Sequence, residues 1–238
     1  MNAHHKHELP LHTPSTASLG TAAAIAMIAW LAIAAQTDLT AARTLARGMS
    51  VVDGLARFSS YLTNLTVLLT ALCFTCIATR TRMPLVRCFR QPTVVTAVVV
   101  YIVFVGLAYN ALLRWLWMPS GYRALVNESL HTVVPALAVL YWVLFVPRFH
   151  LSLRQCILWL VYPLLYLFIT LWRGSESDFY PYWFINVSEL GYERVLLNST
   201  MLVAGFIVLM SVFLVINHRR EDLRVPEPEV ESNDSGNA

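Results

Sequence analysis

Residues 94–113 read VVTAVVVYIVFVGLAYNALL and contain no charged side chain. A helix rises about 1.5 Å per residue, so a run of this length crosses the hydrocarbon core of a bilayer, which is about 30 Å thick. Inside that layer every backbone polar group needs a partner within the protein, and a continuous apolar run provides these partners as a helix. The stretch therefore predicts a transmembrane helix, which we extend to Trp115.

Five further runs are long and apolar enough to cross a bilayer in the same way. The chain has 57% hydrophobic and only 13% charged residues, whereas a soluble domain has about 25% charged residues. We therefore predict an all-α integral membrane protein, a bundle of six transmembrane helices over residues 19–217. The predicted spans are residues 19–35, 60–78, 94–115, 130–146, 156–172 and 195–216.

The two ends of the chain are predicted to be disordered tails. Residues 1–18 are polar, and residues 218–238 are acidic and rich in Pro, Ser, Asn and Gly, so neither segment can form a core. Metal binding is an alternative for the first tail, but we predict no metal site and no cofactor. The histidines of that tail are His4, His5, His7 and His12.

The first span also has an alternative interpretation as a signal peptide. Ala32-Ile33-Ala34 resembles a cleavage site for the removal of such a segment. The apolar run is longer than the core of a usual signal peptide, and five more spans follow it. These features favour a span that is retained.

Lys and Arg concentrate in cytoplasmic loops, so their distribution predicts the orientation of the bundle. The bias is modest, and it predicts that both termini lie in the cytoplasm. The predicted location is the cell membrane. All four cysteines then lie on the cytoplasmic side or in the cytoplasmic half of the membrane, where thiols stay reduced. We interpret Cys73 and Cys76 as apolar filler rather than a redox or metal motif. The more basic side carries Lys6, Arg80, Arg82, Arg87, Arg90, Arg148, Arg154, Arg219, Arg220 and Arg224, and the other side carries Arg43, Arg47, Arg57, Arg114, Arg123, Arg173 and Arg194.

The second predicted span begins with polar side chains at its outer end. Ser59, Thr63, Thr66 and Thr70 are spaced by three or four residues and form one stripe on a helix. Ser and Thr in membrane helices often bond the carbonyl four residues earlier or hold neighbouring helices together, which is the structural interpretation of the stripe. The functional interpretation is that Thr63, near the start of the helix, is a nucleophile.

The fourth predicted span also begins at the outer face, and it carries the one histidine of seven that falls within a span. His131 is expected at about the depth of Thr63. Glu128 lies three residues earlier on the same helix face and is predicted to orient the imidazole. A Thr hydroxyl within hydrogen-bond reach of a His forms a nucleophile–base pair, although a lone buried His is more often a core residue whose hydrogen bonds are satisfied.

Further polar side chains are expected at the same level of the membrane. Two asparagines and an arginine are candidates for polarising an oxyanion or holding a carboxylate head group, although the arginine has the alternative of reaching the interface. The outer loop before the sixth span is rich in aromatic residues and is either an aromatic belt or a lid over a pocket. The supporting or substrate-binding candidates are Asn64, Asn110, Arg114, Tyr180, Tyr182 and Asn198, together with Glu128.

Three segments resemble the bacterial six-pass membrane family abbreviated Pr-six-Pr, which is related to the eukaryotic androgen-induced-gene membrane proteins. They are Phe58 to Thr66, His131 to Pro135 and Tyr180 to Phe184, and the similarity extends over residues 19–217. The eukaryotic relatives are threonine hydrolases that cleave fatty acid esters of hydroxy fatty acids. The resemblance implies that Thr63 is the nucleophile and His131 the catalytic histidine. The run from His131 to its proline is one residue shorter than in the eukaryotic pattern, and the residues at Asn64 and Thr66 also differ from it.

We therefore predict a lipid-ester hydrolase that works from the outer leaflet, in which Thr63 attacks an ester carbonyl and His131 takes its proton. The alternative is a non-catalytic lipid-binding or regulatory membrane protein, and a transporter or channel is a third possibility. Polar residues mainly at the outer end favour a pocket over a path through both leaflets. The expected partners are membrane lipids and a lipid-like substrate, because a net charge of +3 without a long basic run argues against nucleic acid.

Overall fold

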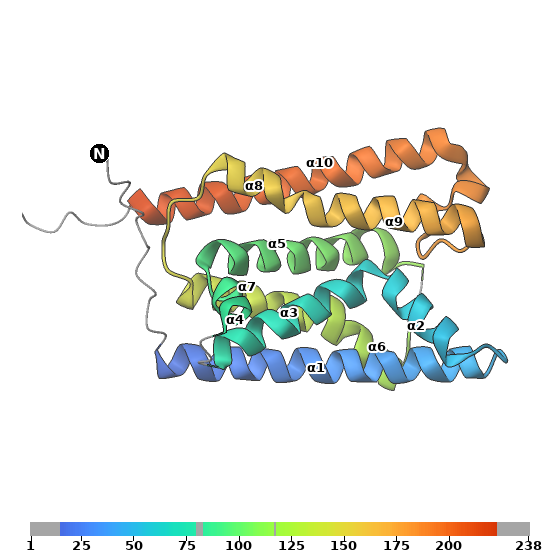
Figure 1. Ribbon diagram of the computed structural model, residues 1–238, viewed down its shortest axis with the longest axis horizontal. Helices are drawn as coiled ribbons and strands as arrows, with labels where there is room; N and C mark the ends of the chain where they lie inside the picture. The colour runs from blue at the N-terminus through green and yellow to red at the C-terminus, as the bar shows by residue number, and fades with distance from the viewer. Residues whose placement is uncertain (1–14, 80–82, 117, 223–238) are drawn as a thin grey trace, which may run out of the picture.

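The computed structural model describes residues 15–79, 83–116 and 118–222, and its regular elements in these ranges are all helices (Figure 1). The fold-class prediction of an all-α, multi-pass membrane protein is confirmed at this level. The predicted tails fall for the most part outside the described residues, and so do the basic residues Lys6, Arg80, Arg82 and Arg224.

Five helical segments are long and apolar enough to cross a membrane. A sixth candidate is a bent pair, α2 (Val51–Ser60) and α3 (Leu62–Ala78), whose axes differ by 83°. Two of the other segments are the single helices α1 (Thr16–Leu45) and α10 (Val187–Asp222). Two more combine two elements each, α5 (Pro92–Ala108) with η1 (Tyr109–Leu113), and α8 (Leu153–Trp159) with α9 (Val161–Ser177). The last combines α6 (Tyr122–Glu128), η2 (Ser129–Val133) and α7 (Val134–Phe145). Two short helices, α4 (Pro84–Phe89) and η3 (Trp183–Ile185), lie between them.

The bend between α2 and α3 has a local cause in the sequence. Ser50 starts α2 with a capping box, in which Ser50 and Asp53 satisfy each other's backbone N–H groups. Tyr61 then adopts an extended conformation (φ −92°, ψ 121°), which ends α2 and starts α3. The chain before Leu62 therefore folds away from the axis of α3 instead of continuing as a straight helix.

The helices are arranged in layers (Figure 1). Helix α3 packs between α1 and α5, and α5 also packs against α7, while α9 and α10 form an outer layer on the other side of α5. Two pairs of polar groups are hydrogen-bonded within this core, Ser18 with the Tyr141 hydroxyl (2.8 Å) and Trp142 with the Thr96 hydroxyl (2.9 Å). All four cysteines are unpaired thiols.

The start of α1 and the end of α10 lie at one end of the molecule, whereas α2 and the segment after α9 lie at the opposite end (Figure 1). We call this opposite end the α2 end. The polar residues that the sequence analysis selected gather there, at the start of α3, at the end of α5 and at the junction of α6 with η2.

Candidate active site

Thr63 lies in the first turn of α3, where the chain has just turned at Tyr61. Its side chain is buried, with 8% of the residue exposed. The Thr63 hydroxyl oxygen lies 3.3 Å from Nε2 of His131. The two residues proposed as nucleophile and base are therefore in contact at a distance just beyond the usual range of about 2.6–3.2 Å, as is common without bound substrate.

The other ring nitrogen of His131 determines the tautomer. Nδ1 lies 2.9 Å from the backbone carbonyl oxygen of Asn127, which only accepts hydrogen bonds. From this pairing we assign the ring proton to Nδ1, which leaves the lone pair of Nε2 directed at the Thr63 hydroxyl. This arrangement is the one that a general base requires.

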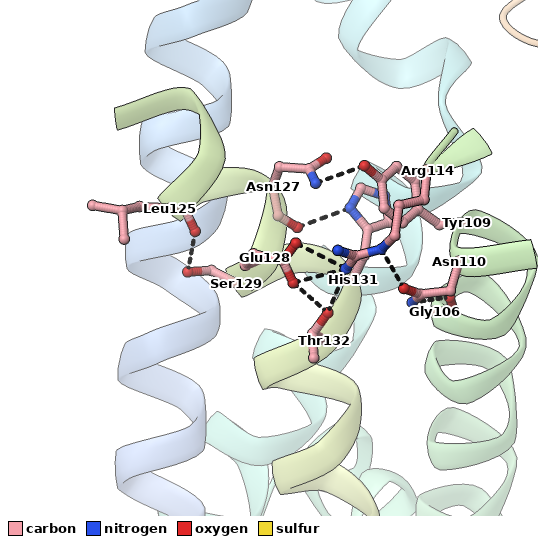
Figure 2. A network of polar contacts seen from close by, with 10 residues as sticks. All are labelled: Gly106, Tyr109, Asn110, Arg114, Leu125, Asn127, Glu128, Ser129, His131 and Thr132. Carbon is pink, nitrogen blue, oxygen red and sulfur yellow. Dashed lines mark hydrogen bonds and ion pairs between the residues drawn. The ribbon is translucent and has the colours of Figure 1, made fainter. Parts of the chain in front are cut away.

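A backbone carbonyl therefore orients His131, in place of the Glu128 carboxylate that the sequence predicted. Glu128 instead accepts hydrogen bonds from Arg114 (2.9 Å) and Thr132 (2.7 Å) and forms an ion pair with Arg114 at 2.8 Å. One turn along, Asn110 accepts a 2.6 Å hydrogen bond from Nε of Arg114 (Figure 2). The physical reason is geometric, because a widened turn directs the imidazole toward the carbonyl of Asn127, four residues earlier.

Two π-helical turns face each other at this position. η1 carries Tyr109 and η2 carries His131, and the two rings are stacked with their centroids 3.8 Å apart. The Tyr109 hydroxyl also accepts a hydrogen bond of 2.7 Å from the buried side chain of Asn127. π-helical turns occur frequently at functional sites because they re-aim side chains.

A close approach of the helices brings these turns together. Gly106 of α5 lies against η2, and a Cβ atom there would lie 2.8 Å from the carbonyl oxygen of His131 and 3.1 Å from the ring of Pro135. A side chain at this position would therefore push the helix that carries His131 away. Asn110 adds to the same junction by donating to the Gly106 carbonyl at 2.8 Å.

Beside Thr63 lies a mostly apolar cavity of about 90 Å³, partly open to the outside. It lies between the start of α3, the end of α5 with η1, and the helices α9 and α10. Tyr182, Phe184 and Ile185 of the loop before α10 also line it. The polar side chains in its lining are Thr63, Tyr109, Tyr166, Tyr182 and Ser199.

The loop is held over the cavity by specific contacts. Asn198 of α10 donates to the carbonyl of Phe184 at 2.9 Å, and the ring of Tyr182 stacks on Phe184 and meets Tyr61 edge-on. Tyr180 lies elsewhere, with its ring packed over Gly174 of α9. Of the loop and α10 residues selected from sequence, Tyr182 thus lines the cavity and Asn198 positions the loop.

The phenol of Tyr182 reaches the start of α3. Burial raises its pKa to about 12, while the Thr63 hydroxyl and the backbone N–H groups of Thr63 and Leu62 act in the opposite direction. Those two N–H groups are the first of the helix and have no intrahelical acceptor. Tyr182 is therefore neutral at physiological pH, with its phenol oxygen next to the Thr63 hydroxyl and these two N–H groups.

The remaining threonines of the stripe make structural contacts. Thr66 shares a 3.0 Å hydrogen bond with the Tyr162 hydroxyl, and Thr70 donates to the Thr66 carbonyl at 2.8 Å. The Asn64 side chain donates to the carbonyl of Phe58 at 2.9 Å and so stabilises the bend between α2 and α3. The structural interpretation of the stripe holds for these residues, and Thr63 differs from them through its contact with His131.

Sequence reasoning missed several residues of this site. Tyr109 and Tyr166 are tyrosines within apolar runs, where nothing distinguishes them from core residues. Asn127 was visible as a polar residue at the start of a span, but its role depends on its backbone carbonyl. Ser199 lines the cavity with a buried hydroxyl that has no hydrogen-bond partner among the described residues, and only the structure reveals this state.

No group of three or more metal-ligating side chains that could hold an ion occurs among the residues that the structure describes. Four histidines of the chain lie outside them. Comparisons of the chain with protein-family models, with curated proteins and with solved structures find no match.

Proposed function

We propose that this protein is a membrane-embedded hydrolase of fatty-acyl ester lipids, with Thr63 as nucleophile and His131 as base. The observation that carries the proposal is the 3.3 Å contact between the Thr63 hydroxyl and Nε2 of His131, whose Nδ1 is held by a carbonyl. The threonine lies at an apolar cavity suited to an acyl chain. The family resemblance of the sequence gives the same two roles to the same two residues.

In the first step the Thr63 oxygen attacks the ester carbonyl carbon while its proton passes to Nε2 of His131. The tetrahedral intermediate collapses when the leaving alcohol takes that proton, which yields an acyl-threonine and neutral His131. Water then attacks the acyl carbon, with His131 again accepting a proton. The protonated imidazole returns the proton to Thr63 and the fatty acid leaves.

The start of α3 supplies stabilisation for the oxyanion of these intermediates. The N–H groups of Leu62 and Thr63 point out of the first turn, where the helix dipole favours negative charge. The phenol oxygen of Tyr182 lies at the same point and faces these N–H groups. We propose that the oxyanion takes the place of this oxygen at the N–H groups and accepts a third hydrogen bond from the neutral phenol. Arg114 and Asn110 are engaged with Glu128 and Gly106, so we assign them to bracing η1 against η2.

The test is ester hydrolysis by the purified protein in nanodiscs. Thr63→Ala and His131→Ala should each reduce the rate by about 10²-fold or more, since general-base assistance contributes about 10² to 10⁴. The double variant should be no slower than either single variant, because the pair acts as a unit. Thr70→Ala is the matched control, because Thr70 is a buried threonine of the same helix whose hydroxyl donates to the Thr66 carbonyl.

A fluorophosphonate probe gives an independent readout. It should label Thr63 in the wild-type protein and not in the His131→Ala variant. If the protein neither hydrolyses lipid esters nor reacts with the probe, the alternative of a non-catalytic lipid-binding protein replaces the hydrolase.

We also propose that the bent pair α2–α3 counts as one of six spans of the cell membrane, with both termini in the cytoplasm. The position of the start of α1 and the end of α10 at one end of the molecule supports an even number of crossings. The α2 end, with the candidate site, then faces outward. A reporter fused after Ala238 should be active only in the cytoplasm, and one inserted at Ser177 only outside. Reporters that both locate to one side would overturn this topology.

A further inference from the structure

A second cavity, of about 210 Å³, lies next to the candidate active site. Tyr166 lines both cavities and separates them, and its hydroxyl donates to the carbonyl of Ser60 at 2.8 Å. Thr63 and Tyr182 line the first cavity and not the second. The second cavity is therefore a separate compartment between α9 and the bend of α2 with α3.

One part of this compartment is polar and contains a guanidinium. Arg173 donates to the Ala56 carbonyl at 3.3 Å, which occupies one of its five N–H donors. No carboxylate pairs with Arg173 among the residues of the described ranges. The hydroxyls of Ser59, Ser60 and Ser177 already donate to backbone carbonyls, and Arg173 is the charged side chain among the residues that line the cavity.

A second arginine stands at the rim of the compartment. The Arg57 guanidinium lies over the ring of Phe179, 4.4 Å from its centroid, and Phe179 lines the cavity. Asp53 is near enough for Arg57 to act on it electrostatically, but the strongest contact of that carboxylate is with Ser50. Two guanidinium groups thus lie at the cavity or its rim, while the neighbouring carboxylates of Asp53 and Asp178 accept hydrogen bonds from Ser50 and Ser188.

The other part of the compartment is apolar and lies at the outside of the helix bundle. Leu65, Leu165 and Ile169 line it, and Leu165 and Ile169 are 54% and 40% exposed on the outside of the bundle. The compartment therefore combines a cationic head region at the α2 end with an apolar wall that continues along α9 into the membrane. An amphiphile with one anionic head group and an acyl chain has this distribution of polarity.

We propose that the second cavity is a binding site for an anionic membrane amphiphile, whose carboxylate or phosphate contacts Arg173 and whose chain lies along Leu165 and Ile169. Arginine suits this role because its planar fork binds both anions through two parallel hydrogen bonds. The site is independent of the hydrolase proposal, because none of its lining residues takes part in the proposed chemistry.

The test uses the full chain in nanodiscs with photoreactive lipids, and the crosslinked peptides are mapped by mass spectrometry. A photoreactive fatty acid and a photoreactive phosphatidylglycerol are the two anionic probes, and a fatty alcohol of the same length is the uncharged control. We expect labelling of α2 and α9 by an anionic probe and at least tenfold weaker labelling by the alcohol. Preferential labelling by the fatty acid identifies a carboxylate as the natural head group. Preferential labelling by phosphatidylglycerol identifies a phosphate.

Arg173→Gln should reduce the anionic labelling about tenfold or more, since a hydrogen bond to a charged group contributes at least about that factor. Gln retains a donor for the Ala56 carbonyl, and Arg173→Lys, which keeps the charge, should retain part of the labelling. Arg194→Gln replaces an exposed arginine of α10 and is the matched control, which should leave the anionic labelling unchanged. Equal labelling of the folded Arg173→Gln protein, or equal labelling by the alcohol, would overturn the proposal.

Discussion

The ring of Tyr109 lies almost flat on the imidazole of His131, with 3.8 Å between centroids and 20° between ring planes. The stack limits tilting of the imidazole, and the hydrogen bond from Nδ1 to the Asn127 carbonyl limits its rotation. These two contacts leave Nε2 with one direction to face, and the Thr63 hydroxyl lies in that direction. The geometry of the dyad thus depends on two residues that take no part in proton transfer.

Substitutions of Tyr109 separate its two contacts. Tyr109→Leu removes the stack, so we expect ester hydrolysis to fall by about 10²-fold, as a displacement near 1 Å can cost. Tyr109→Phe keeps the stack but leaves the buried Asn127 amide without its acceptor, which should lower the stability by about 1–3 kcal/mol and preserve most activity. Hydrolysis rates and thermal unfolding in detergent distinguish the two effects. Equal activity of both variants would contradict the positioning role of the stack.

The sequence predicted that Thr63 and His131 lie at about the same depth, near the starts of two spans, so that a contact between them was possible. The distance of 3.3 Å between the Thr63 hydroxyl and Nε2 of His131 comes from the structure. The sequence did not predict the bend before α3. The bend occurs at Tyr61, and residues 60–78 contain no Gly or Pro that would indicate a break in the helix. From the helical spacing, the sequence analysis also predicted that Glu128 orients the imidazole of His131. That spacing assumes a regular turn, whereas η2 is a π-helical turn and a backbone carbonyl faces the ring.

Glu128 should therefore contribute little to catalysis. Its carboxylate and Arg114 are 42% and 40% exposed, and pairs of this kind contribute about 0–1 kcal/mol to stability. Glu128→Gln keeps an acceptor for both Arg114 and Thr132, so we expect kcat to stay within about threefold of the wild type, since less than 1 kcal/mol is lost. A loss comparable to that of His131→Ala, measured in the same hydrolysis assay, would restore Glu128 as the group that acts on the imidazole.

Gly106 tests how closely α5 and η2 must approach. Gly106→Ala places a methyl group 2.8 Å from the His131 carbonyl oxygen, so the helices must separate. We expect a loss of about 1–3 kcal/mol in stability, as for overpacked cores, together with reduced hydrolysis because His131 moves. Gly205→Ala is the matched control, since a Cβ atom at this helical glycine of α10 meets nothing within 4 Å. If both variants unfold at the wild-type temperature, the contact is not close in solution.

Tyr182 tests the assignment of the oxyanion donors. If its phenol donates to the oxyanion, Tyr182→Phe should lower kcat by about 10²- to 10³-fold with little change in KM, since the hydrogen bond strengthens in the transition state. Burial raises the pKa of Tyr182 to about 12, so the wild-type phenol keeps its proton and this contribution should persist as the pH rises through 10. Tyr180→Phe is the matched control, because Tyr180 belongs to the same loop but packs over Gly174, away from Thr63. An equal loss in both variants would mean that the loop acts only as a cover, and the backbone N–H groups of Leu62 and Thr63 would then be the remaining oxyanion donors.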